Sequence, residues 1–385
     1  MNAIESSIYQ DLMDALQILK PNSTPTNPSD VNTYQEDVPC QYIYYGPPGC
    51  GKTHKLQTSY ISKFTEKNRF ITTFHQSFSY EEFVEGLKPI LVNEDGSTSQ
   101  DEIGDIKYKV VKGIFREACE RAAELAGYAS LKECIEDTFE NRTIKIYQAI
   151  KEKKTVLLGI DEINRGNVAS IFGDLISLIE TSKRLGAENE MKVILPYSKE
   201  EFGVPANLLI VGTMNTADRS IQLLDTALRR RFKFEELLPD YEEIKKNNDA
   251  KEILKNINAR IRCLLNKDYQ IGHAYFMHAK SNKEILSIMV NKIIPLLEEY
   301  FYNDIEKIRF VLNENEKTDN PFYVIDEETK NTYKIYSKIS EIDDDRNFYK
   351  LNDDLKKVLK KEDNEENENE FKKYLPKYKI KKNDE

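Results

Sequence analysis

The amino-acid sequence predicts an α/β fold with a parallel-sheet core, inserted β-hairpins and a C-terminal helical region. Three observations support this prediction. A phosphate-loop motif at 46–53 stands between a short strand and a helix. Two continuous apolar runs, 155–160 and 208–213, are typical of strands buried on both faces of a parallel sheet. From 239 to 312 the apolar residues recur at helical spacing, which indicates a separate helical domain.

These patterns divide the 385 residues into four parts. We expect an N-terminal helix and linker at 1–38, a nucleotide-binding α/β domain at 39–238, a helical domain at 239–312, and a charged, partly disordered extension at 313–385. A hydrophobic content of 39% is enough for a real core in a chain of this length.

Charge and cysteine usage narrow the class of protein. The net charge of -10 argues against a general nucleic-acid coat, although it leaves local DNA contact open. The five cysteines are scattered, without C-x-x-C spacing, so we expect reduced thiols and no zinc site. The sequence has no signal pattern and no apolar run as long as a membrane span, which together favour a cytoplasmic protein that does not enter a membrane.

The phosphate loop satisfies G-x-x-x-x-G-K-[ST] in the strand-loop-helix context that the motif requires. Its predicted nucleotide-binding residues are Gly46, Pro47, Pro48, Gly49, Cys50, Gly51, Lys52 and Thr53. Glycines let successive backbone N–H groups point inward, and the following helix adds its positive end. Lys52 would reach the outer phosphates, and the hydroxyl of Thr53 would help to hold Mg²⁺.

Two hairpins are expected as insertions in the α/β domain. Ser79 and Glu82 form a capping-box pattern that starts a helix, and a strand-like alternation at 106–111 follows a turn at 93–97. A second hairpin is expected within 191–205. The long interval between the phosphate loop and the next nucleotide motif also favours inserted elements.

Acidic side chains follow the first apolar run. Asp161 and Glu162 fall where that strand ends, at the edge of the sheet where open α/β folds bind ligands. Asp161 would support Mg²⁺, and Glu162 would orient or deprotonate an attacking water. After them, an apolar stripe at 168–179 predicts one core helix that ends near Glu180.

The second apolar run brings Asn215 to the same edge of the sheet. Its side-chain amide would hold the attacking water or the terminal phosphate, whereas a lone Asn after a strand is usually a turn former. Three adjacent arginines follow at the end of a predicted helix, namely Arg229, Arg230 and Arg231. They would either form a solvated helix end or supply an arginine finger to a neighbouring subunit. His273 is interpreted as a structural histidine.

Five segments together give a resemblance to a known family. They are 74–86 (FHQSFSYEEFVEG), 161–167 (DEINRGN), 214–220 (MNTADRS), 227–232 (ALRRRF) and 271–276 (IGHAYF). In this order they resemble the McrB-type GTPases, a branch of the AAA+ superfamily that supplies the motor subunit of McrBC modification-dependent restriction systems. The resemblance covers roughly residues 40 to 310.

The resemblance implies an AAA+ fold with a helical lid and a GTP-hydrolysing homohexameric ring that uses Mg²⁺, with ATP as the alternative substrate. It also implies an McrC-type nuclease partner, and DNA bound through the assembled complex. Asn215 would be the sensor residue, Asp218 and Arg219 would belong to the signature loop, and arginines among 229–231 would act in trans. Family members commonly carry an N-terminal DNA-reading domain, and 1–38 predicts only a helix and a linker, which leaves DNA reading by this subunit open.

Two other functional classes are consistent with part of the sequence. A MoxR-like ATP-dependent chaperone would share the phosphate loop and the acidic strand end, but the segments 161–167 and 214–220 argue against it. A non-catalytic, nucleotide-gated scaffold is disfavoured because Lys52, Asp161 and Glu162 are all present.

Overall fold

The computed structural model describes residues 41–92, 105–218, 226–315, 317–331, 333 and 347–378. These residues form two compact units. The first contains the sheet and continues to Glu236, and the second contains Leu237 onward together with the loop Gly46–Gly51. The expected helix at 1–20, the linker at 21–37 and the turn at 93–97 lie outside the described residues.

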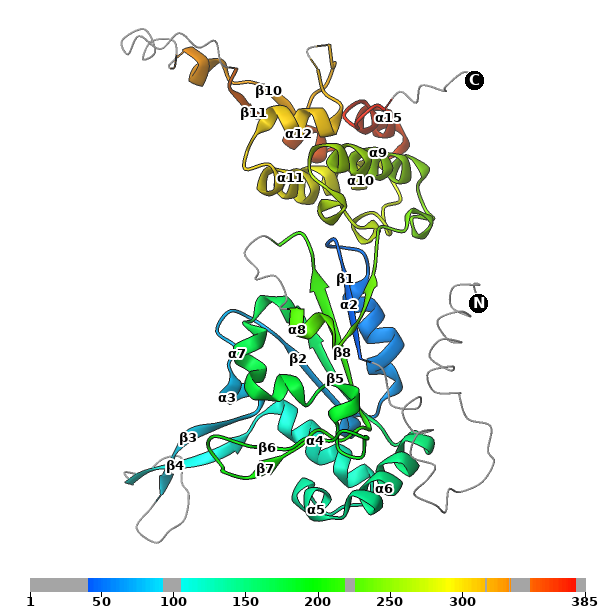
Figure 1. Cartoon of the computed structure of the whole chain (residues 1–385). Helices are drawn as coiled ribbons and strands as arrows, with labels where there is room; N and C mark the ends of the chain where they lie inside the picture. Colours follow the sequence, from blue (N-terminus) through cyan, green and yellow to red (C-terminus); the bar gives the residue numbers. More distant parts are fainter. Residues whose placement is uncertain are drawn as a thin grey trace. The chain divides into compact units, whose positions relative to one another are not determined.

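A five-stranded sheet is the centre of the first unit, and helices lie on both of its sides (Figure 1). The strand order is β2-β5-β8-β1-β9. The strands are β1 (Tyr42–Gly46), β2 (Arg69–Thr73), β5 (Val156–Asp161), β8 (Leu208–Asn215) and β9 (Lys233–Glu236). β2 pairs with β5, β5 with β8, and β1 with β9, and each of these pairs is parallel. The parallel core predicted from the two apolar runs is confirmed.

Helices connect and cover these strands. Those of the first unit are α2 (Lys52–Lys55), α3 (Tyr80–Phe83), α4 (Ile114–Leu125), α5 (Leu131–Glu136), α6 (Phe139–Lys151), α7 (Val168–Phe172) and α8 (Thr226–Arg229). α2 continues through a π-helical turn, Leu56–Tyr60, and a 3-10 turn, Ile61–Lys63. The apolar stripe at 168–179 is buried in the core as predicted, but the expectation of one continuous helix is wrong. Gly173 adopts a φ of +52° and ends α7, and a 3-10 turn then carries Leu175 into the core.

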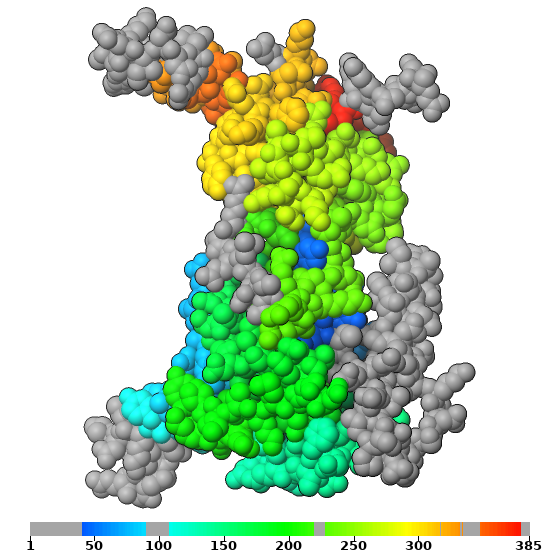
Figure 2. Space-filling view, viewed as in Figure 1, coloured from blue at the N-terminus to red at the C-terminus, as the bar shows by residue number. Residues whose placement is uncertain are grey.

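Both predicted hairpins are present. β3 (Glu85–Val92) pairs antiparallel with β4 (Asp105–Lys112), and this hairpin projects from the body of its unit at the lower left of Figures 1 and 2. The second hairpin is short and joins β6 (Val193–Ile194) to β7 (Glu201–Phe202). The capping box of Ser79 and Glu82 begins α3 as expected. Among the described side chains of the first hairpin, Leu87 and Tyr108 are exposed.

A cluster of aromatic rings fills the core between the sheet and the hairpins. Its members are each at most 1% exposed and are Phe74, Phe83, Phe115, Phe172 and Phe202. Phe83 is at the centre, with ring centroids 5.0 Å from Phe115 and 4.7 Å from Phe172. Offset and tilted ring pairs at these distances add to the free energy gained by apolar burial. This cluster therefore joins α3, α4 and α7 to the hairpin of β6 and β7, through the contact of Phe115 with Phe202.

The second unit is mainly helical. Its longer elements are α9 (Asn248–Leu264), α10 (Asn282–Ile288), α11 (Ile294–Tyr300), α12 (Ile305–Leu312), β10 (Tyr323–Ile325), β11 (Tyr349–Leu351), α14 (Asp354–Leu359) and α15 (Glu365–Lys373). A π-helical turn, Met289–Ile293, links α10 to α11. No helix within the described ranges is long and apolar enough to cross a membrane.

The C-terminal extension differs from its sequence-based expectation. A run of Glu, Asn, Asp and Lys predicts a solvated tail from about Lys360. Instead, α15 forms with Asn364 as its N-cap and buries Phe371 completely. One buried aromatic side chain, together with polar contacts such as the Asn282 N–H to Glu368 and the Lys372–Asp249 ion pair, therefore holds a helix of otherwise polar composition.

We predict that the aromatic cluster is a major source of stability in the first unit. The change Phe83→Ala should lower the free energy of unfolding by about 3–5 kcal/mol, because it leaves a cavity among packed rings. Urea unfolding followed by circular dichroism measures this loss. The control Tyr108→Ala, at a residue 69% exposed, should change stability by about 0.5 kcal/mol or less. Equal losses in the two variants would contradict the prediction.

Candidate functional site

The phosphate loop has the backbone conformation that its glycines make possible. Gly49 and Gly51 have φ values of +77° and +83°, in the region that residues other than glycine rarely adopt. At Gly46 a Cβ atom would lie 2.1 Å from the carbonyl oxygen of Leu237, so no side chain fits there. The loop therefore has the backbone conformation that the phosphate-loop motif predicts.

The loop leads into α2, where two predicted side chains stand at the start of the helix. Lys52 is buried, with 6% of its surface exposed. The hydroxyl of Thr53 donates to the carboxylate of Asp161, with Oγ1 3.3 Å from Oδ1 and 3.5 Å from Oδ2. Asp161 is the last residue of β5, so the helix start and the strand end meet at one edge of the sheet.

Thr213 joins the ends of two neighbouring strands. The hydroxyl of Thr213 donates to Oδ1 of Asp161. The hydroxyl oxygen of Thr213 also accepts a hydrogen bond from the backbone N–H of Glu162 at 3.2 Å. No sequence pattern indicates this role, because a threonine in a strand is common for its β-branched side chain alone. Thr213 fixes the direction of the Asp161 carboxylate relative to the next residue.

Glu162 lies in a left-handed backbone conformation, with φ at +53°. For a residue other than glycine this conformation costs about 1–2 kcal/mol. The side-chain amide of Asn215 donates to Oε1 of Glu162, and the amide of Asn164 donates to the carbonyl oxygen of Asn215 at 2.9 Å. Asn215 therefore meets Glu162, as the shared sheet edge predicted, and its amide holds the carboxylate directly.

The second oxygen of Glu162 faces a cation. Among the described residues no hydrogen-bond donor reaches this buried Oε2, and the Nε atom of Arg165 lies 3.6 Å away. Arg165 also lies 3.6 Å from the carboxylate of Asp218 and is half exposed. Burial raises the pKa of Glu162, while the Arg165 guanidinium opposes that rise. Arg165 was missed as a site residue, since a charged residue after a strand has no distinctive spacing.

The oxygen atoms of Thr53 and Asp161 fit a magnesium ion. Two neighbouring ligands on an octahedral Mg²⁺ ion stand about 2.9 Å apart, because each lies about 2.0–2.1 Å from the metal. The observed Oγ1 to Oδ1 distance of 3.3 Å is close to this value. No cluster of three or more His, Cys, Asp or Glu residues with metal-binding geometry occurs in the ranges that the structure describes. Such an ion would thus depend on nucleotide oxygens and water for its remaining ligands.

The three arginines at the end of α8 and just after it do not have equal surroundings. Arg231 turns inward, where its Nη2 atom lies 3.5 Å from Glu180 and its carbonyl oxygen accepts the side chain of Gln41. Arg229 and Arg230 are exposed, and the Arg229 guanidinium lies 5.8 Å from the ring centroid of Phe234. Burial therefore sets Arg231 apart from the two candidates for action in trans. Arg219, predicted in the signature loop, lies outside the described residues.

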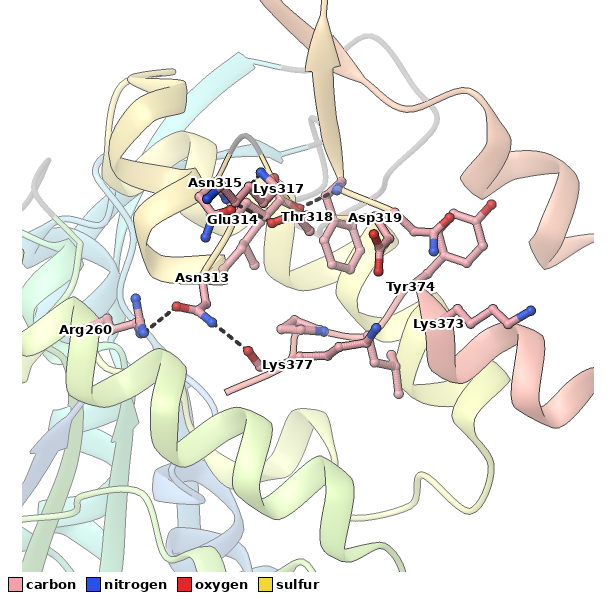
Figure 3. Close-up of a pocket in the computed structure, with 15 residues that line it drawn as sticks. Arg260, Asn313, Glu314, Asn315, Lys317, Thr318, Asp319, Lys373, Tyr374 and Lys377 are labelled. Atoms are coloured by element: carbon pink, nitrogen blue, oxygen red, sulfur yellow. Dashed lines mark hydrogen bonds between the residues drawn. The ribbon is translucent and has the colours of Figure 1, made fainter. Parts of the chain in front are cut away.

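A separate cavity of about 580 Å³ lies in the second unit, beside the end of α12 and the segment that follows α15 (Figure 3). Arg260 donates to Asn313 at 2.7 Å, and Asn313 donates to the carbonyl oxygen of Lys377 at 2.6 Å. Burial raises the pKa of Glu314 in its wall to about 7. None of its lining residues belongs to the predicted nucleotide site, and its walls carry both signs of charge.

Comparison with known proteins agrees with this geometry. Residues 42–232 match the family described as AAA domain (dynein-related subfamily), and residues 249–309 match McrB, alpha-helical lid domain. The chain is 31% identical over 332 residues to the Type IV methyl-directed restriction enzyme EcoKMcrB subunit of Escherichia coli strain K12. That alignment covers 79% of this chain and 62% of the relative's length.

A second relative is the Type II restriction enzyme BsuMI component YdiS of Bacillus subtilis strain 168. It is 27% identical over 305 residues, which cover 71% of this chain and 82% of the relative. The fold and the two family matches define an AAA+ NTPase with a helical lid. Within that class, the chain is similar to the restriction subunits named above, and it spans about three fifths of the length of the first of them.

The raised pKa of Glu162 gives a prediction about stability. A carboxyl group whose pKa is higher in the folded protein stabilises the fold at low pH and loses that contribution as the pH rises through the folded pKa. The change Glu162→Gln removes the buried charge, so the unfolding free energy of the variant relative to that of the natural protein should rise as the pH increases from about 4 through the folded pKa of Glu162. Urea unfolding across this range measures the difference. A difference that shrinks with rising pH would contradict the assigned direction.

Proposed function

We propose that this chain hydrolyses GTP at the edge of the sheet formed by the phosphate loop, β5 and β8. The observation that carries the proposal is the set of contacts that joins Thr53, Asp161, Thr213, Glu162 and Asn215. Three separate segments of the chain, the start of α2 and the ends of β5 and β8, bring these side chains together. Each of these five side chains has a functional group that a site for phosphoryl transfer to water can use.

The proposed reaction assigns one task to each group. Lys52 and the backbone N–H groups of the loop bind the phosphates. Thr53 and Asp161 would hold Mg²⁺, which when bound neutralises charge on the phosphate oxygens. Glu162 accepts a proton from the attacking water through Oε2, the oxygen that no described hydrogen-bond donor reaches. Asn215 keeps the carboxylate in place through Oε1.

The relatives support a proposal about the wider role of the chain. Both are components of restriction enzymes, and one is described as methyl-directed. We propose that this chain forms a homohexameric ring, binds an McrC-type nuclease subunit, and drives DNA translocation by the complex during restriction of foreign or modified DNA. GTP is the proposed substrate, with ATP as the alternative, and Mg²⁺ is the proposed cofactor. The exposed Arg229 and Arg230 would act in trans on a neighbouring subunit, and Asp218 and Arg219 would belong to the signature loop.

The alternative of a MoxR-like chaperone is not favoured. The helical region matches the McrB lid at residues 249–309, and the relatives described above are restriction components. A non-catalytic scaffold is also disfavoured, because a scaffold has no need of the contacts that position Glu162.

We predict that hydrolysis depends on Glu162. Steady-state phosphate release should be faster with GTP than with ATP, and Glu162→Gln should lower the GTP rate by at least about 100-fold while leaving nucleotide binding in place. The measurement is made with and without an McrC-type subunit from the same source. An unchanged GTP hydrolysis rate in Glu162→Gln would contradict the role assigned to Glu162. A faster rate with ATP than with GTP would contradict the proposed preference for the guanine nucleotide.

A mixing experiment tests the arginines. Arg230→Ala should lower GTP hydrolysis by at least about 100-fold, because an arginine finger stabilises charge in the transition state. If this residue acts in trans, adding Glu162→Gln protein, which still has its arginine, should restore part of the activity. Arg231→Ala should instead lower stability, through loss of its pairing with Glu180. Full activity in both Arg229→Ala and Arg230→Ala would contradict a role for either residue.

A further inference from the structure

The phosphate loop has most of its contacts with the helical unit, although β1 and α2 flank it in the sequence. The six residues Gly46–Gly51 group with Leu237 onward, and the flanking Tyr45 and Lys52 group with the sheet. A segment of the second unit must therefore contact the loop. The contacts identify it as the short segment 271–275, which the sequence singled out only for its resemblance to a family motif.

Two backbone hydrogen bonds join this segment to the loop. The N–H of Gly272 donates to the carbonyl oxygen of Pro48 at 2.9 Å, and the N–H of Ala274 donates to the carbonyl oxygen of Gly49 at 3.0 Å. They direct two of the loop's carbonyl groups toward the helical unit. Since a peptide N–H points away from its neighbouring carbonyl, this arrangement leaves adjacent N–H groups of the loop to face the other way, where phosphates bind.

The two backbones are as close as their atoms permit. A Cβ atom at Gly272 would lie 1.9 Å from the carbonyl carbon of Gly49 and 2.4 Å from the backbone nitrogen of Cys50. A Cβ atom at Gly49 would lie 2.8 Å from the ring of Tyr275. Glycine is therefore required at both positions. Any side chain at Gly272 must push the loop away.

The segment 271–275 is in turn fixed by hydrogen bonds to other residues of the second unit. The buried side chain of Asn258, on α9, accepts the N–H of Ile271 at 2.7 Å and donates to the carbonyl oxygen of the same residue at 2.8 Å. On the other side, Nδ1 of His273 accepts the N–H of Asp240 at 3.0 Å. These bonds fix the residues on both sides of Gly272, so the segment forms a rigid support.

We propose that the segment 271–275 is a positioning element for the phosphate loop, and that Gly272 and Tyr275 determine how tightly the loop binds nucleotide phosphates. Neither residue touches the reacting atoms. They act by holding Pro48 and Gly49 in the conformation that presents the loop's N–H groups. The nucleotide part of this inference rests on the proposed function, whereas the support of the loop does not.

Cys50 offers a readout that needs no nucleotide. Its thiol lies in the loop and is 5% exposed, whereas Cys263 is exposed and distant in sequence. In nucleotide-free Gly272→Ala protein, the rate of alkylation at Cys50 should rise at least about tenfold, because the loop is pushed open. Peptide mapping by mass spectrometry separates this thiol from Cys263, whose rate should not change.

The same variants are then titrated with a fluorescent GTP analogue. Gly272→Ala should weaken binding by at least about 100-fold, and Tyr275→Leu, which leaves the two hydrogen bonds intact, by about tenfold. The matched control is Gly127→Ala, since Gly127 also has a positive φ but a Cβ there meets no atom within 4 Å. Its Cys50 reactivity and GTP affinity should equal those of the natural protein.

The outcomes distinguish the two proposals. Folded Gly272→Ala and Tyr275→Leu proteins with unchanged Cys50 reactivity would overturn the positioning role, whatever the nucleotide data. If Gly272→Ala does not fold, Tyr275→Leu alone decides. If the natural protein binds neither GTP nor ATP, the proposed function fails, and the alkylation rates still show whether the segment supports the loop.

Discussion

The hydrogen bonds between the ends of β5 and β8 are the contacts on which the rest of the site depends. Thr213 holds the carboxylate of Asp161, and Asn215 holds that of Glu162. Parallel pairing of two apolar strands brings these residues side by side, and the long apolar runs ensure that pairing by burying both faces. The functional edge is thus a direct product of the hydrophobic pattern of the core.

The site also uses strain and burial that a stable fold alone would avoid. Glu162 has a left-handed backbone, a buried oxygen without a described hydrogen-bond donor, and a raised pKa. Such features cost stability and are concentrated where chemistry occurs. Arg165 limits the cost, since its guanidinium opposes the rise in the pKa of Glu162, whereas the carboxylate of Asp218 adds to that rise. An arginine at the surface of the site therefore affects how basic the carboxylate is.

Sequence patterns predicted the sheet, the hairpins and the residues with distinctive chemistry, such as Lys52, Asp161 and Glu162. They missed Thr213 and Asn164, because a threonine in a strand and an asparagine in a turn have ordinary structural uses. They also extended the helix beyond Phe172, where Gly173 ends it, and missed α15, whose polar composition hides the single anchor Phe371. Contacts between distant segments, such as Gly49 with Gly272, have no local signal at all.

Every step of the proposed reaction requires that the loop 46–53 bind the phosphates of a nucleoside triphosphate. Isothermal titration calorimetry measures this binding for GTP and ATP, with Mg²⁺ and with a chelator, in the natural protein and in Lys52→Ala. We expect Mg²⁺-dependent binding that Lys52→Ala weakens by at least about 100-fold, because a buried cation at the loop is lost. Equal binding by the two proteins would contradict this expectation.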